Sequence, residues 1–156
     1  MTNSTLTSTK KLLAGRMVLT FAAAVTGVTP FLADWNHTHI YNEQWPPHAK
    51  FHNAQTLSVG ALLSAAALFY TWRSKGGVRA NLLPAVGFSS LYWVSQSMAF
   101  AFPGVAWTDP HLLKPGQSLE QFPQQVPLEI VLYSLITVGT ALVLAGTADK
   151  HASTQV

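Results

Sequence analysis

Residues 53–72 read NAQTLSVGALLSAAALFYTW, a run of about 20 residues without a charged side chain. A helix of this length crosses the roughly 30 Å hydrocarbon core of a bilayer. The composition of the whole chain points the same way, because 49% of its 156 residues are hydrophobic and only 10% are charged. In soluble domains roughly a quarter of the residues are charged. This stretch therefore predicts a membrane helix.

Three further apolar segments surround this one. The first resembles a signal peptide in its basic start, but no clean small-x-small cleavage site follows it and three more apolar segments do. We therefore expect an all-α, integral membrane four-helix bundle with both short tails outside the helices. The predicted helices span about 11–33, 53–72, 81–102 and 127–146, with a disordered N-terminal tail at 1–10 and a C-terminal tail at 147–156.

Charge predicts the orientation of the bundle. Cytoplasmic loops of membrane proteins carry an excess of Lys and Arg, and seven of the nine basic residues fall on one side of the predicted helices: Lys10, Lys11, Arg16, Arg73, Lys75, Arg79 and Lys150. Both termini are therefore expected in the cytoplasm. For a bacterial protein the membrane would be the inner membrane of the cell.

The opposite side collects the ionisable groups that could do chemistry. Residues 34–55 read DWNHTHIYNEQWPPHAKFHNAQ and hold four of the six histidines and two of the five tryptophans. A second connection, residues 103–126, ends at the same side. We expect the two connections to meet at the outer face and to form the functional site.

The histidines suggest two kinds of chemistry. His48 and His52 are four residues apart and would share one helix face with Gln55 if the second helix began near Pro47. Neutral imidazoles ligate divalent transition metals, so a metal site is one interpretation, although no known metal motif is present. Alternatively, the histidines and tryptophans anchor this connection at the membrane–water interface. The candidate metal ligands are His37, His39, His48 and His52.

Two acids and a group of polar and aromatic residues in the third predicted helix, at Tyr92, Trp93 and Gln96, complete the candidate site. Asp34 closes the first helix, where it could simply mark the water boundary, and Glu129 lies in the first turn of the fourth, where the helix dipole favours a negative charge. A partly buried carboxyl beside a histidine could also move a proton. The candidate catalytic residues are His48, His52, Glu129 and Asp34; the candidate substrate-binding residues are Trp35, Asn53, Gln55, Tyr92, Trp93 and Gln96.

Several functions are excluded or disfavoured. The chain has no cysteine, which excludes disulfides, thiolate metal sites and cysteine nucleophiles. The basic residues lie in small groups beside apolar segments, so nucleic acid is not an expected partner.

Small residues recur four apart at Ala23 and Gly27, at Gly60 and Ser64, and at Ala141 and Ala145, which is typical of close helix contacts in lipid.

The run Trp45–Gln55, WPPHAKFHNAQ, resembles the signature of a family of small four-helix membrane proteins of unknown function found in bacteria and fungi. His37-Thr38-His39 and Asn42 match the same pattern. The resemblance implies a recurrent membrane domain and no particular activity. In architecture alone the chain also resembles the sterol-binding emopamil-binding and sigma-two receptor group, from which no residue role is carried over.

Two functions are consistent with these observations. The first is a membrane protein that binds or converts a lipophilic small molecule entering from the lipid, by acid–base or metal-assisted chemistry. The second is a non-catalytic accessory or structural subunit whose histidine-bearing connection contacts a membrane-complex partner or a second copy of the chain.

Overall fold

The computed structural model describes residues 3–106, 108–118 and 126–154, and these contain four α-helices, one short 3₁₀ helix and no strand. The prediction of an all-α chain with four helices is confirmed. The elements are α1 (Asn3–Asp34), α2 (Pro47–Trp72), α3 (Gly77–Ala99), η1 (Pro110–Leu112) and α4 (Val126–Thr154).

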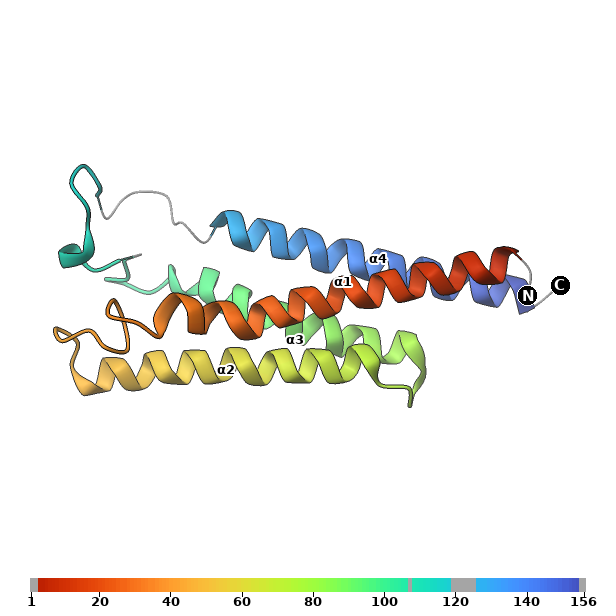
Figure 1. Cartoon of the computed structure of the whole chain (residues 1–156), viewed down its shortest axis with the longest axis horizontal. Helices are drawn as coiled ribbons and strands as arrows, with labels where there is room; N and C mark the ends of the chain where they lie inside the picture. Colours follow the sequence, from red (N-terminus) through yellow and green to blue (C-terminus); the bar gives the residue numbers. More distant parts are fainter. Residues whose placement is uncertain (1–2, 107, 119–125, 155–156) are drawn as a thin grey trace.

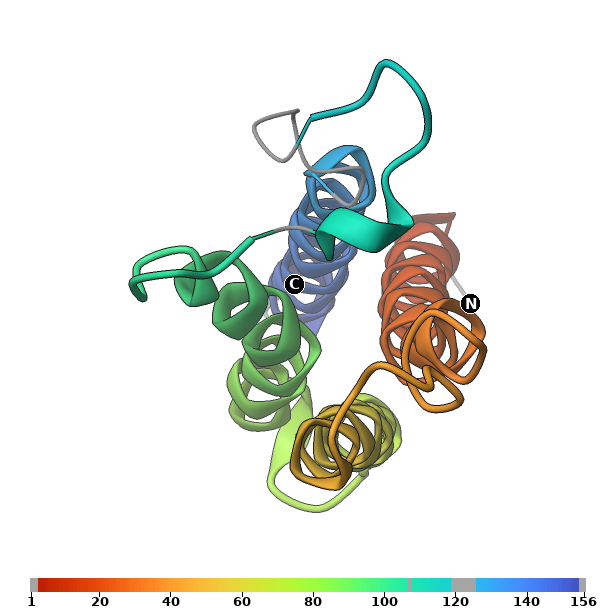
Figure 2. The same ribbon diagram turned by 90° about the vertical axis from the view of Figure 1, so that its left-hand side faces the viewer.

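Each helix runs antiparallel to the helix before it (Figure 1). Viewed end-on, α1 packs beside α2 and α4, and α3 lies diagonally opposite α1 (Figure 2). Both termini and the α2–α3 turn share one end of the bundle, which we call the terminal end. Residues 35–46 and 108–118 share the other, which we call the loop end.

All four helices begin earlier than expected, and α3 also ends earlier, at Ala99. α1 begins at Asn3 and includes most of the segment predicted as a disordered tail, while α4 continues to Thr154. Each extension contacts the opposite helix: Asp149 Oδ2 in the α4 extension lies 2.9 Å from Lys11 Nζ, and the buried hydroxyl of Ser8 in the α1 extension donates to the Gly146 carbonyl. At the loop end α2 begins at Pro47, since proline fits the first helical turn, where its missing N–H has no intrahelical partner.

α1, α2 and α4 are long and apolar enough to cross a membrane, whereas α3 does not meet the same test within the described residues. α3 carries several polar residues, and two of them point into the bundle. Ser89 and Asn81 are buried, and Asn81 Nδ2 donates to the carbonyl oxygens of Lys75 and Gly77. Leu83, on the opposite face of α3, is 79% exposed.

Glycines bring the backbones of α1 and α4 together. A Cβ atom at Gly15 would lie 2.7 Å from the Gly139 carbonyl oxygen, and one at Gly146 would lie 2.7 Å from the Leu12 nitrogen. Of the small residues singled out in the fourth helix, Ala141 is exposed, and the closest approaches to α1 are instead at Gly139 and Gly146. Two of the other small-residue pairs do lie at a close helix contact, between α1 and α2: Ser64 is buried and donates to the Ala23 carbonyl beside Gly27.

The α1–α4 contact leads to a stability prediction. Gly15→Ala should destabilise the bundle by about 1–3 kcal/mol, because the new methyl group meets rigid backbone rather than a movable side chain. Gly87→Ala is the matched control, since no atom lies within 4 Å of the added carbon and alanine favours a helix. Denaturant unfolding in detergent should show a loss for the first variant only; equal stability of the two would contradict this packing.

Candidate functional site

An open cavity of about 220 Å³ lies at the loop end, lined by the last turns of α1 and α3, by His39, by the segment after α3 and by the first turn of α4. Five of the residues singled out from the sequence line it: Asp34, His39, Tyr92, Trp93 and Gln96. Apolar side chains such as Ala99, Phe100 and Leu128 complete the wall. The exposed wall is therefore about half polar and half apolar, and we call the polar part, around Asp34, His39 and Gln96, the polar side.

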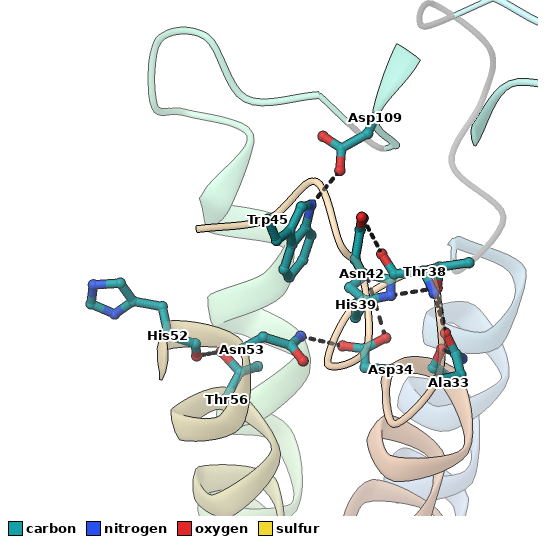
Figure 3. Close-up of polar contacts among 11 residues, drawn as sticks. Ala33, Asp34, Thr38, His39, Asn42, Trp45, His52, Asn53, Thr56 and Asp109 are labelled. Atoms are coloured by element: carbon teal, nitrogen blue, oxygen red, sulfur yellow. Dashed lines mark hydrogen bonds and ion pairs between the residues drawn. The ribbon is translucent and has the colours of Figure 1, made fainter. Parts of the chain in front are cut away.

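Asp34 is the centre of the polar side. Its Oδ2 accepts a hydrogen bond of 2.9 Å from Asn53 Nδ2 on α2, and its Oδ1 lies 3.7 Å from His39 Nε2 (Figure 3). The Asp34 side chain is 19% exposed and that of His39 is 32% exposed. A partly buried carboxylate is costly without polar partners. Asn53 makes the shorter of the two contacts.

The residues around His39 fix the direction of its hydrogen bonds. Asn36 Nδ2 donates to the Ala33 carbonyl, so Asn36 Oδ1 is free to accept from the Thr38 hydroxyl at 2.6 Å. The hydroxyl has only one proton, and it therefore accepts from His39 Nδ1, 2.7 Å away. With Nδ1 protonated, Nε2 faces Asp34. The contact is attractive when Nε2 also carries a proton or when a hydroxyl lies between the two groups.

Gln96 offers the cavity an acceptor without a partner. Its Oε1 is buried and makes no hydrogen bond among the described residues, and the side chain lines the cavity. A buried carbonyl oxygen left without a donor costs roughly 1–3 kcal/mol. The neighbouring Trp93 is different, because its indole N–H donates to Thr26 Oγ1 at 2.9 Å. Gln96 is thus the polar group that a bound molecule could satisfy.

The two connections at the loop end meet, as the sequence predicted. Trp45 Nε1 donates to Asp109 Oδ2 at 2.6 Å (Figure 3), and the Trp45 ring packs edge-on against His39 with ring centroids 5.0 Å apart. Asn42 is only 4% exposed, and its Nδ2 lies 3.3 Å from His111 Nε2. These contacts place the segment with η1 above the cavity residue His39.

His48 and His52 lie outside the cavity. Both are exposed on the first turns of α2, where they contact each other and Gln55, and His52 points away from the Asp34 network (Figure 3). Asn53, the next residue, points the other way and bonds Asp34. None of the candidate residues on α2 lines the cavity, and Asn53 acts on it through its hydrogen bond to Asp34.

Three other candidates also lie apart from it. Trp35 is 55% exposed and its indole donates to Tyr41, and His37 is exposed with its ring against the same tyrosine. Glu129 is 8% exposed and accepts a hydrogen bond of 2.8 Å from Ser97 on α3, so it joins α3 to α4. None of these three lines the cavity.

The described ranges bring together no group of three or more His, Asp or Glu side chains that could hold a metal ion. The four candidate ligands instead fall into three places: His39 beside Asp34, His37 beside Tyr41, and the exposed pair on α2.

The residues that orient the site's side chains were not predicted from the sequence. Thr38 and Asn36 orient His39, and Asp109 receives Trp45. Asn36 could have been found, because an Asn side chain often bonds the backbone N–H two residues later, and Asn36 Oδ1 accepts from Thr38 N at 2.8 Å. No local sequence pattern indicates that Trp45 bonds Asp109, which is 64 positions away.

The fold and the cavity define a class: an antiparallel four-helix bundle with an Asp–His pair in a cavity of mixed polar and apolar lining. Residues 18–150 match a family of unknown function, DUF6640, and the chain belongs to that family. This agrees with the expected membership of a family without an assigned activity; that Trp45–Gln55 is its signature stays a prediction. Comparison with curated proteins and with solved structures finds no match.

The contact between the two connections leads to a test by hydrogen exchange. Trp45→Phe keeps the aromatic ring but removes the N–H that bonds Asp109, so amide exchange should speed up several-fold in both residues 35–46 and 108–118, for a loss of about 1 kcal/mol. Trp35→Phe is the control, because that indole bonds only within its own segment. Unchanged exchange in 108–118 of Trp45→Phe would show that the contact does not hold the segments together.

Proposed function

We propose that the protein is a multi-pass membrane protein that binds a lipophilic molecule carrying a hydroxyl group in the loop-end cavity. The proposal is supported by Gln96, a cavity-lining residue whose buried Oε1 lacks a donor, in a cavity whose wall combines apolar and polar surface. Acid–base conversion of the bound molecule by Asp34 and His39 stays a prediction from the sequence.

Membrane insertion is supported by the exposed surface. Large apolar side chains are exposed on all four helices, among them Leu32 at 76%, Leu62 at 70%, Leu83 at 79% and Ile130 at 61%. Contiguous apolar exposure of this kind is unfavourable in water and favourable in lipid. Leu83 lies on α3, so α3 has a lipid-facing side even though its inner side is polar.

The terminal end supports the proposed orientation. Arg16 lies over the Trp72 ring at 5.6 Å and Arg73 over the Phe69 ring at the same distance. Aromatic rings and snorkelling arginines are enriched where helices leave the hydrocarbon. With the basic residues at this end, we place both termini in the cytoplasm and the cavity on the opposite face.

The polar side of the cavity suits a hydroxyl because a hydroxyl both donates and accepts. Its proton can go to Gln96 Oε1 or to Asp34 Oδ1, and its oxygen can accept from a protonated His39 Nε2. At about 220 Å³ the cavity is somewhat smaller than the roughly 300–1,000 Å³ of common ligand sites. It therefore fits the polar end of a ligand whose remainder lies in the bilayer.

The orientation can be tested with single cysteines, since the chain has none of its own. Ser118 and Ser74 are both exposed, at opposite ends of the bundle, and serine to cysteine is a small change at each. A membrane-impermeant maleimide added to intact cells should label Ser118→Cys and leave Ser74→Cys unlabelled until the cells are opened. The reverse pattern would invert the orientation, and labelling of both in intact cells would rule out a membrane between them.

Ligand binding can be tested with a photoreactive long-chain alcohol and the matched alkane. Gln96→Leu should reduce labelling by the alcohol about tenfold, since one hydrogen bond of about 1.4 kcal/mol is lost, and should leave labelling by the alkane unchanged. Gln55→Leu is the control, because Gln55 is an exposed glutamine outside the cavity. Equal alcohol labelling of wild type and both variants would contradict the proposal and favour the accessory-subunit alternative.

A further inference from the structure

The exposed histidine pair on α2 is not explained by the cavity. His48 Nε2 and His52 Nε2 lie 3.0 Å apart, with ring centroids 4.5 Å apart and ring planes 80° to each other. Neither residue lines the cavity. The spacing of four residues on a helix brings the two rings to one face, and the proline at the start of α2 ensures that His48 is already helical.

Gln55 determines which nitrogen of His52 is available. Its Oε1 lies 3.3 Å from His52 Nδ1, and an amide oxygen can only accept, so Nδ1 carries the proton. In the neutral ring the lone pair is then on Nε2, the atom that faces His48. A histidine whose second nitrogen donates to an amide or carboxylate oxygen is the usual arrangement of a metal ligand.

We propose that His48 and His52 chelate Cu²⁺ through their Nε2 atoms, with water in the remaining coordination positions. Metal–imidazole bonds are about 2.0–2.1 Å long, so two nitrogens in adjacent positions of a square-planar ion lie about 2.9 Å apart, and in a tetrahedral ion about 3.3 Å. The observed 3.0 Å fits the square-planar or tetragonal geometry that Cu²⁺ prefers with nitrogen ligands.

Metal binding requires a change of tautomer in the pair. Without metal, His48 Nε2–H donates to the lone pair of His52; with metal, the proton of His48 moves to its Nδ1 and both Nε2 lone pairs face the ion. No third His, Asp or Glu completes the sphere within the part of the chain that the structure describes. The ion therefore keeps positions open to water, which suits a site that takes up and releases metal at the membrane face.

The test is titration of the tag-free, detergent-purified chain with Cu²⁺ alone, followed by electron paramagnetic resonance. The wild type should bind one equivalent with coupling to two imidazole nitrogens, and His48→Ala and His52→Ala should each bind at least tenfold more weakly. His37→Ala is the matched control, because His37 is an exposed histidine of the loop end outside the pair. Binding that is unchanged in either pair variant, or lost equally in His37→Ala, would overturn the proposal.

Discussion

The carboxylate of Asp34 sits where an apolar helix ends, and the arrangement of the loop end depends on how that charge is stabilised. Asn53 from α2 donates to one oxygen, and His39 from the following segment faces the other. Because a partly buried carboxylate is costly without such partners, these contacts hold residues 35–46 close to the bundle. Trp45 then reaches Asp109, and the segment that carries η1 is brought over the cavity.

The helices could be predicted because their signals are local. Apolar runs of about 20 residues, separated by Gly, Pro and charged residues, determine the number and the order of the helices. The bounds were less accurate for a physical reason: residues 3–10 are polar and read as a tail, but Ser8 and Lys11 pair with Gly146 and Asp149, which are more than 130 positions away. No local pattern contains that information.

The location of the site could be predicted, and its exact members only in part. The gathering of histidines, acids and tryptophans at one end indicated where two connections would meet, and Asp34, His39 and Gln96 do line one cavity. The rotation of α2 could not be read from spacing. One residue along a helix turns a side chain by about 100°, so Asn53 faces Asp34 while His52 faces outward, and only tertiary packing decides which of the two points in.

Native mass spectrometry of the protein released from its own membranes tests directly whether the loop-end cavity holds a lipophilic alcohol. The wild type should carry an added mass whose formula is a hydrocarbon with hydroxyl oxygen, and Ala99→Trp, which fills the cavity from its wall, should not. A bare wild-type chain, or an adduct retained in Ala99→Trp, would contradict it.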